Sequence, residues 1–348
     1  MLALLAAIPR AGAQTPALET QAPALETYGP SMRYDGPPAP AFHSPLARAA
    51  QKWRLCAVLP HVKDPYWLDV VHGMSGEARR LGVALRIVET GGYYGKTQQI
   101  AALSGCVAGK ADAIVFGSVA YRDPDIVAAI AQAAKTAPVV AAVNDVDAPA
   151  LAAKVGVSWR RMGEEAGRWF SARHPKGSAP GAAALASGPP EAGWTGILAE
   201  GLAAGLAASS VRLVESEGAD SDTFEQYRLV ERLLERRPDA DYLIGAAPAV
   251  ESARAILARR PDLARIGLVA TYFTSTLRRA LAQGRILAAP FDWPQAQGAL
   301  AVEYAVRARE GALDHRQIGP RVTLLSAGMT LDPRHFAPPD FEPSFDIE

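Results

Sequence analysis

The run LCAVLPHVKDPYW, residues 55–67, decides the fold of this chain. Its first part, residues 55–59, is continuously apolar and ends at Pro60, as expected of a strand buried on both faces. Apolar residues at helical spacing follow over 66–80. The segment therefore predicts a buried strand followed at once by a crossover helix, which is the repeating unit of parallel α/β folds.

The same alternation continues outward along the chain. Strand-like apolar runs lie at 83–88, 113–116, 139–143, 153–157, 182–186, 211–215, 241–245, 266–270 and 286–289, and helical patterns, such as 97–109, 125–136 and 160–173, lie between them. A chain of 348 residues with 49% hydrophobic residues is long enough for two domains with real cores. We therefore expect an α/β protein of two doubly wound parallel-sheet lobes.

The domain boundaries follow from these two blocks of alternation. We expect an N-terminal lobe of 51–155 plus 294–312, a C-terminal lobe of 156–293 plus 313–330, and a C-terminal tail of 331–348. Residues 14–50 are rich in Pro and Ala and show little periodicity, so they predict a linker or an extended arm.

The N-terminus predicts export. Leu2 to Ile8 form a short apolar run, and Ala11-Gly12-Ala13 fits the small-residue pattern of a cleavage site, although no basic residue precedes the run. Residues 1–13 are therefore expected to be a signal peptide. No other stretch approaches about 18 uninterrupted apolar residues, so we expect no membrane-spanning helix.

The charge balance argues against nucleic acid as a partner. The 36 Lys and Arg residues equal the 36 Asp and Glu residues, whereas a nucleic-acid-binding domain needs a basic face. A repressor of the LacI type would share the predicted fold. It would also need an N-terminal helix-turn-helix, which the Pro-rich residues 14–50 cannot form.

The chain has two cysteines, Cys56 on the first predicted strand and Cys106 on a helix that can pack against the same sheet. Export to an oxidising compartment would permit one disulfide between them. The alternative is a pair of buried thiols that pack as small apolar groups. Neither a CxxC motif nor a Cys/His ligand spacing is present, so no metal site is expected.

Aromatic and polar side chains recur where ligands bind in such sheets, beyond the carboxyl ends of the strands. They are Asp64, Tyr66, Trp67, Tyr93, Asn144, Trp159, Tyr272, Asp292 and Trp293. Any one of these aromatic residues is readily explained by core packing. Their recurrence at equivalent strand ends predicts a binding cleft between the two lobes.

No catalytic constellation is recognisable. The six histidines lack HExxH spacing, residues 117–119 do not form a G-x-S-x-G elbow, and no phosphate-binding G-x-x-x-x-G-K-[ST] loop occurs. His61, near the predicted cleft, is better explained as a turn residue than as a general base. We therefore expect a binding protein that needs no cofactor, and not an enzyme.

Five segments resemble one known family. They are residues 55–67, ETGGYYGK at 89–96, VGVSWRRMGEEAG at 155–167, ARHPKGS at 172–178 and IGLVATYFT at 266–274. Together they resemble the trimethylamine N-oxide receptors of the type I periplasmic binding protein family, over roughly residues 52–348. The resemblance implies the type I fold, a periplasmic location, trimethylamine N-oxide as the ligand and the periplasmic domain of a membrane sensor histidine kinase as the partner.

The resemblance also implies roles for particular residues. It assigns Asp64, Tyr66, Trp67, Tyr93, Trp159 and Tyr272 to the ligand pocket. Arg160 and Arg161 depart from the family's pattern, in which aromatic character is expected after Trp159. At that point the resemblance therefore does not define the wall of the pocket or the partner surface.

The chemistry of trimethylamine N-oxide fits these residue types. Its methyl groups carry the positive end of a strong dipole and suit the ring faces of Trp67, Trp159 and Tyr272. Its oxide needs hydrogen-bond donors, such as the hydroxyls of Tyr66 and Tyr93 or a water held by Asp64. A sugar site would use several polar side chains, and Asn144 and Asp292 are compatible with it. A receptor for a sugar or another small solute of an ABC transporter is therefore the alternative.

Overall fold

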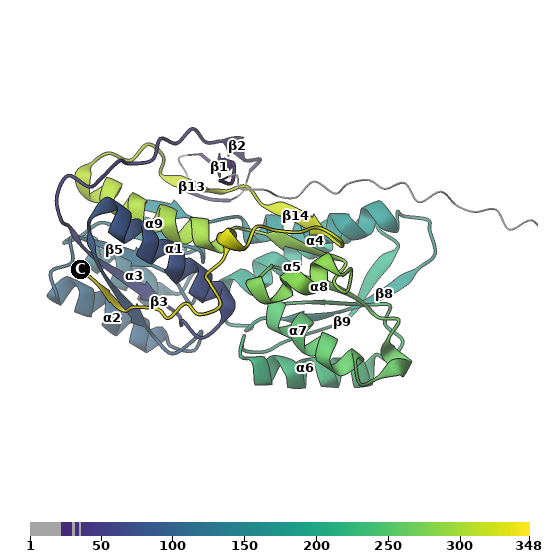
Figure 1. Ribbon diagram of the computed structural model, residues 1–348. Helices are drawn as coiled ribbons and strands as arrows, with labels where there is room; N and C mark the ends of the chain where they lie inside the picture. Colours follow the sequence, from purple (N-terminus) through teal and green to yellow (C-terminus); the bar gives the residue numbers. More distant parts are fainter. Residues whose placement is uncertain (1–21, 30–31, 35) are drawn as a thin grey trace, which may run out of the picture.

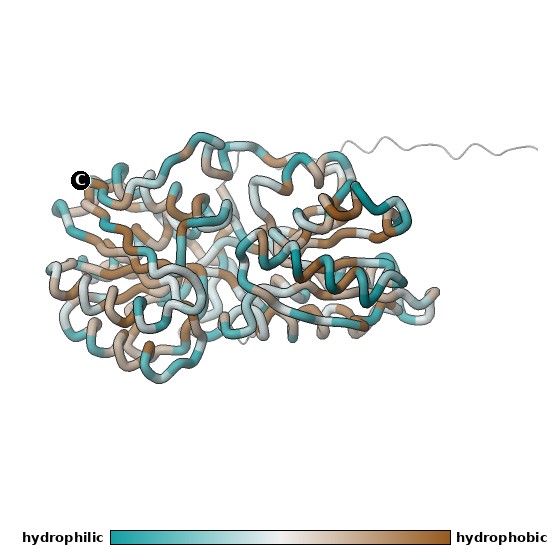
Figure 2. The backbone as a smooth tube through the Cα atoms, turned by 90° about the horizontal axis from the view of Figure 1, so that it is seen from below, coloured by the Kyte–Doolittle hydropathy of each residue, from teal (hydrophilic) through white to brown (hydrophobic). Residues whose placement is uncertain are grey.

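The computed structural model describes residues 22–29, 32–34 and 36–348. The chain forms two lobes side by side, each a sheet with helices on both faces (Figure 1). Hydrophobic segments run through the interior of both lobes in Figure 2. The signal peptide predicted over 1–13 lies outside the described residues. Within the described part of the chain, no helix is both long and apolar enough to cross a membrane.

The first lobe is built around the buried strand that contains residues 55–59. Its parallel strands lie in the order β4-β3-β5-β6-β7, with bounds β3 Arg54–Leu59, β4 Ala84–Glu89, β5 Ala113–Phe116, β6 Val139–Ala142 and β7 Ala153–Val155. Helices α1 (Pro65–Leu81) and α9 (Pro294–Glu310) pack together on one face, and α2 (Lys96–Ala108) and α3 (Pro124–Ala133) on the other. Every residue of β5 and β6 is buried, which explains their continuous apolar sequence.

The second lobe repeats this plan. Its parallel strands lie in the order β9-β8-β10-β11-β12, with β14 antiparallel at the edge; the bounds are β8 Gly181–Ser187, β9 Val211–Gly218, β10 Tyr242–Gly245, β11 Gly267–Ala270, β12 Ala288–Phe291 and β14 Thr323–Ser326. Helices α4 (Trp159–Arg173) and α5 (Gly193–Leu206) pair with each other, as do α6 (Thr223–Arg236) and α7 (Ala247–Leu257), and a short α8 (Arg278–Ala282) follows β11.

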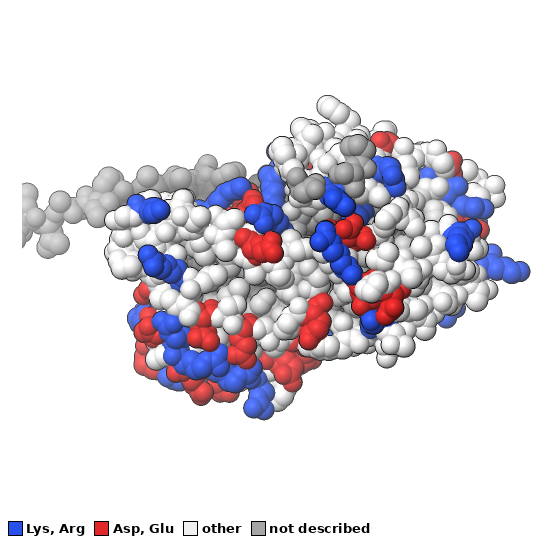
Figure 3. Space-filling model, turned by 180° about the vertical axis from the view of Figure 1, so that it is seen from behind, with Lys and Arg blue, Asp and Glu red and all other residues white. Residues whose placement is uncertain are grey.

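The surface charges show no single-sign face in the view of Figure 3. Lys and Arg alternate there with Asp and Glu along the lower edge of the second lobe, where α6 lies. Arg232 and Arg236 on this helix pair with Glu217 of β9 at 2.6 and 2.5 Å.

The predicted boundary of the second lobe is wrong at one strand. β13 (Gln317–Pro320) lies inside the range 313–330, yet it pairs in parallel with β7 of the first sheet, whereas β14 pairs in the second. The chain thus passes between the lobes four times, after β7, after β12, after β13 and after β14. The short sequence QIGP gives no apolar run, so sequence pattern could not assign this strand to a sheet.

The range 14–50 is more than a linker where the structure describes it. β1 (Leu25–Thr27) pairs antiparallel with β13, and β2 (Ala39–Pro40) pairs with β1, so this N-terminal arm extends the first sheet. The Glu26 carboxylate lies 2.8 Å from the Arg321 guanidinium and 3.2 Å from that of Arg161 at the start of α4. The arm therefore crosses the junction between the lobes and is bonded to both of them.

The C-terminal tail returns to the first lobe. β15 (Asp346–Ile347) pairs antiparallel with β4, and the end of the chain lies beside the first lobe in Figure 1. On the way the backbone amide of Ala337 donates to the buried Asp69 carboxylate of α1 at 2.7 Å. In the same lobe, Cys56 of β3 and Cys106 of α2 are joined by a disulfide that ties this helix to the sheet.

His43 connects the arm to α9 and makes that contact sensitive to pH. Its ring nitrogens lie 3.0 Å from the Asp314 carboxylate and 3.3 Å from that of Glu303, which also pairs with Arg307 at 2.8 Å. Hydrogen bonding to Glu303 raises the pKa of His43 above 6.5, whereas the hydrogen bond from His43 helps to hold the pKa of Glu303 low against the effect of burial.

Because the folded-state pKa of His43 is raised, its stabilising effect should be complete below about pH 6.5 and lost as pH rises through the folded pKa. Between pH 6 and pH 8.5 we expect the free energy of unfolding of the parent chain to fall by about 1 kcal/mol relative to that of His43→Gln. This is the scale of one hydrogen bond. Urea unfolding of both proteins across this range measures the difference. A constant difference between them would show that the arm contact does not titrate.

Candidate functional site

Six aromatic side chains meet between the two lobes. They are Tyr66, Trp67, Tyr93, Trp159, Trp194 and Tyr272, and all are buried. Neighbouring ring centroids lie 5.0 Å apart for Trp159 and Trp194, 5.5 Å for Tyr66 and Tyr272, and 6.4 Å for Tyr93 and Trp194. We call this group the aromatic cage. The first lobe supplies Tyr66, Trp67 and Tyr93, and the second supplies the other three.

The first turn of α1 places two rings of the cage. Asp64 has extended backbone and its side chain accepts the amide of Trp67 at 2.9 Å, which caps the helix, and Pro65 occupies the first helical position. Helix α1 therefore begins at Pro65, six residues beyond the end of β3. As a result Tyr66 and Trp67 lie at the base of the cleft, with Trp67 only 1% exposed.

Close contact between α4 and α5 brings two tryptophans together. Trp159 begins α4 and Trp194 lies in the first turn of α5. A Cβ atom on Gly201 of α5 would lie 1.9 Å from the carbonyl oxygen of Arg160, so only glycine permits this approach. The close crossing of the helices sets the tilted contact of the Trp159 and Trp194 rings, whose planes meet at 35°.

The Tyr66 hydroxyl is engaged with the segment that joins the lobes. It donates to the Asp292 carboxylate at 2.5 Å, and the Gln297 amide of α9 donates to the same carboxylate oxygen at 2.8 Å. Burial raises the pKa of Asp292 to about 6, while these hydrogen bonds act to lower it. Tyr66 therefore contributes a ring edge to the cage, and its hydroxyl proton is already used within the protein.

The Tyr93 hydroxyl has its proton available. The Asn144 side-chain nitrogen donates to the Ser118 carbonyl oxygen at 2.8 Å, which identifies it as the amide nitrogen, and it also donates to the Tyr93 oxygen at 3.3 Å. Val143, just before Asn144, has a φ of 66°, a strained value for a β-branched residue, and the next amide turns back onto Ala142. This backbone fixes Asn144, and Asn144 fixes the Tyr93 oxygen.

Trp194 is the site residue that sequence reasoning missed. Its indole nitrogen is buried without a hydrogen-bond partner among the described residues, and its ring stands beside Tyr93. It follows β8 by seven residues, beyond a Gly-Pro-Pro turn at 188–190, whereas Tyr93, Trp159 and Tyr272 follow their strands by two to four residues. A search over the whole connection to the following helix would have included it.

Trp293 is not part of the cage. Its backbone is left-handed, with φ of 58°, and this reverses the chain just before α9. The Trp293 ring packs against Phe291 and His335, with centroids 4.8 Å away in each case, and its nitrogen donates to the Thr323 hydroxyl at 3.3 Å. Asp292 and Trp293 thus point to different surroundings, although they are adjacent in sequence.

Arg160 and Arg161 point away from the cage. Arg160 pairs with Glu164 at 3.2 Å and with Glu200 at 3.4 Å on the surface. Arg161 pairs with Glu26 of the arm. The departure from the family's pattern therefore changes the surface of α4 and the anchoring of the arm, and leaves the ring wall intact.

Two further groups border the cage. The buried His61 ring stands edge-on to Trp67 and Tyr93, and burial lowers its pKa. Its nitrogen lies 3.9 Å from the Asp64 carboxylate, whose pKa burial raises. Among the described residues no group of three His, Cys, Asp or Glu side chains has the arrangement of a metal site.

The cage is closed. Its cavity measures about 10 Å³, which is the room of a single water molecule. A second cavity of about 80 Å³ adjoins it at the cleft mouth, where Lys63 of the first lobe lies 3.4 Å from Asp220 of the second. A ligand therefore enters only if the rings of the two lobes separate, and rotation of the lobes about the segments that cross between them provides that motion.

Comparisons with known proteins agree with this geometry. The profile of the family described as periplasmic binding proteins and the sugar-binding domain of the LacI family matches residues 52–287. Periplasmic protein TorT of Escherichia coli K12 is 35% identical over 280 residues, which are 80% of this chain and 79% of that protein.

Solved structures of related proteins have the same fold. A chain of the complex between the TorS sensor domain and TorT in the presence of TMAO has a TM-score of 0.75 and 34% identity, over 84% of this chain and 99% of that one. The same complex without ligand has a TM-score of 0.75. An ABC transporter solute-binding protein from Bradyrhizobium sp. BTAi1 with bound bis-tris has a TM-score of 0.80 and 32% identity, over 93% of this chain and 98% of that one.

Proposed function

The chain belongs to the TorT proteins of the periplasmic binding protein family, and on that premise we propose that it binds trimethylamine N-oxide in the aromatic cage and reports the ligand to the periplasmic domain of a sensor histidine kinase. The family confirms the expected fold, the periplasmic location and the expectation of a binding protein instead of an enzyme. The observation that carries the proposal is a closed cage of aromatic rings, contributed by both lobes, that contains two hydrogen-bond donors with protons to spare.

The rings suit the methyl groups of the ligand. Trimethylamine N-oxide is neutral overall, but its three methyl groups share the positive end of the dipole. The faces of Trp67, Trp159 and Tyr272 are electron-rich and buried, and each well-placed ring contributes about 0.5–2 kcal/mol to binding a cationic group.

The oxide end suits Tyr93 and Trp194. The Tyr93 hydroxyl oxygen already accepts from Asn144, so its proton is free for the oxide. The Trp194 N–H is buried beside the Tyr93 hydroxyl and makes no hydrogen bond of normal geometry among the described residues, so an oxide acceptor in the cage would satisfy it. We therefore assign the oxide to these two donors and not to Tyr66, whose hydroxyl is bonded to Asp292.

Signalling follows from closure between two lobes. A ligand that bridges rings from both lobes stabilises the closed arrangement by its differential affinity for it. A partner that prefers the same arrangement is then coupled to the ligand, and the coupling is reciprocal. The TorS sensor domain is the partner of TorT in the solved complexes, so we propose the equivalent domain for this chain.

We expect the sensor's periplasmic domain to change the dissociation constant of the chain for trimethylamine N-oxide by about five- to 150-fold, the usual range of coupling between sites. Calorimetric titration of the chain, alone and saturated with the sensor domain, measures this change. An unchanged constant in a preparation where the two proteins do bind would reject the coupling.

A receptor for an ABC transporter is the second candidate, because the transporter protein from Bradyrhizobium covers 93% of this chain. Two observations count against a sugar ligand. Asn144 and Asp292, the polar groups that a sugar would use, already hold Tyr93 and Tyr66 in place. Titration with D-ribose separates the candidates, since only a sugar receptor of an ABC transporter is expected to bind a sugar saturably.

A further inference from the structure

A large cavity lies away from the aromatic cage. It measures about 1100 Å³ and lies in the second lobe, at the amino ends of β8, β10 and β11. The cage lies at the opposite, carboxyl ends of the same strands. A volume of about 300–1000 Å³ is usual for small-molecule sites, so this cavity is large enough for a ligand of substantial size.

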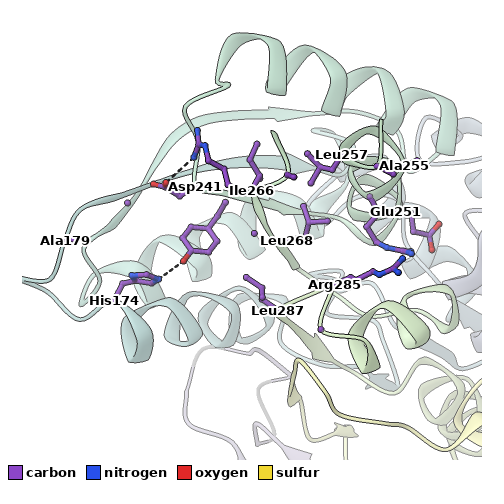
Figure 4. A pocket seen from close by; sticks show the side chains of 18 of the residues that line it. His174, Ala179, Asp241, Glu251, Ala255, Leu257, Ile266, Leu268, Arg285 and Leu287 are labelled. Atoms are coloured by element: carbon purple, nitrogen blue, oxygen red, sulfur yellow. Dashed lines mark hydrogen bonds and ion pairs between the residues drawn. The ribbon is translucent and has the colours of Figure 1, made fainter. Parts of the chain in front are cut away.

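The cavity has an apolar middle (Figure 4). Ile266, Leu268 and Leu287 line it between its two ends, and Leu257 of α7 contributes to one wall. Ile266 and Leu268 are each only 4% exposed. The middle of the cavity therefore favours an apolar ligand body.

The two ends of the cavity differ in their polar groups. At one end the His174 ring lies 2.6 Å from the Tyr242 hydroxyl, and Asp241 lies 3.4 Å from Arg265, so these groups satisfy one another. Glu251 and Arg285 lie at the other end in Figure 4.

The cations at that other end are not paired. Within the described part of the chain neither Arg254 nor Arg285 has a carboxylate within 4.0 Å, and the Nε of Arg254 is buried without a hydrogen-bond partner. Glu251, which lines the same end of the cavity, also has a buried oxygen without a partner, and burial raises its pKa to about 7, although the nearby Arg254 acts to lower it. Neither guanidinium therefore has an ion-pair partner within the described part of the chain.

We propose that this cavity is a second binding site, for an amphipathic carboxylate whose charged end lies between Arg254 and Arg285 and whose apolar body covers Ile266, Leu268 and Leu287. Planar guanidinium groups bind carboxylates through paired, charge-assisted hydrogen bonds, which explains two free arginines at one end of an apolar cavity. Glu251 also lines the cavity at the cleft mouth, so the site adjoins the route to the cage.

Octanoate is a suitable probe, with 1-octanol as its uncharged counterpart. In calorimetric titrations of the full chain, octanoate should bind saturably and at least about tenfold more tightly than 1-octanol. Arg254→Met and Arg285→Met should each weaken octanoate at least about tenfold. Glu251→Gln should strengthen it, because a competing negative charge is removed.

Three further variants make the test selective. Arg259→Met removes an exposed arginine just beyond α7 that does not line the cavity, and should bind octanoate like the parent. Ala255→Phe fills the cavity from an exposed position on α7 and should abolish binding. Trp159→Ala, in the cage, should leave octanoate binding unchanged.

If both arginine variants, or Ala255→Phe, bind octanoate as tightly as the parent chain does, the second site is overturned. Absence of saturable binding to the parent would overturn it as well. Loss of octanoate binding in Trp159→Ala would assign this ligand to the cage instead. None of these outcomes bears on trimethylamine N-oxide, so the second site and the proposed function fail separately.

Discussion

Replacement of Trp159 by alanine is expected to weaken trimethylamine N-oxide binding by about 2–4 kcal/mol, or about thirty- to several-hundredfold, as for a central binding residue. Trp159 touches Trp194, Tyr66 and Tyr272, with ring centroids 5.0–6.5 Å away. Its loss removes one face of the cage and the support of the neighbouring ring faces. Calorimetric titration of the variant measures the loss.

Trp169→Ala is the matched control for this experiment. Trp169 lies on the same helix and is equally buried, at 4% exposure, but it packs against Phe170 and Tyr242 in the core of the second lobe. Both variants should lose folding stability, because each leaves a cavity where an indole was. Only Trp159→Ala should lose affinity. Equal affinities in the two variants would show that the cage is not the ligand site.

Tyr93→Phe is expected to weaken trimethylamine N-oxide by about 1.5–3 kcal/mol, or about ten- to 150-fold, because a hydrogen bond to a charged oxygen is lost while the ring stays. Tetramethylammonium provides a direct check, since it has a methyl group where the oxide stands. Tyr93→Phe should leave the dissociation constant for tetramethylammonium within about threefold of that of the parent chain. Titration of both ligands into both proteins forms a double cycle that isolates the contact between hydroxyl and oxide.

Tyr66→Phe separates the two hydroxyls of the cage. This substitution removes the donor to Asp292, so it should lower folding stability by about 1–3 kcal/mol and raise the pKa of Asp292 further above its present value of about 6. Its affinity for trimethylamine N-oxide should stay near that of the parent. A loss as large as that of Tyr93→Phe would contradict the assignment of the oxide donors.

The core strands could be predicted because burial on both faces of a strand produces a continuous apolar run in the sequence. β5 and β6 are wholly buried and read as the unbroken apolar runs AIVF and VVAA. β1, β13 and β15 have two to four residues and pair with partners far away in the chain, so no local pattern reveals them. Their placement depends on tertiary contacts such as those between Glu26, Arg161 and Arg321.

The cage could be predicted only in part, for a similar reason. Residues a few positions beyond a strand end, such as Tyr93 or Tyr272, are carried to the cleft by the sheet itself. Trp194 reaches it through the turn at 188–190 and the close packing of α5 on α4, neither of which is visible in a strand pattern. Trp293 was included because it follows Asp292, but its left-handed backbone turns the ring away.

The hydrogen-bond partners of the cage residues could not be predicted from the sequence at all. Both Tyr66 and Tyr93 appear as possible oxide donors when only residue types are known. Asp292 comes from a segment more than two hundred residues away from Tyr66, and it is this contact that removes Tyr66 from the list of donors.

The most direct test of the central claim is calorimetric titration of the full chain, without a partner, with trimethylamine N-oxide and in parallel with D-ribose. The account predicts saturable binding of one trimethylamine N-oxide per chain and no saturable heat with D-ribose. Saturable binding of D-ribose with no response to trimethylamine N-oxide would contradict it and would favour the transporter receptor.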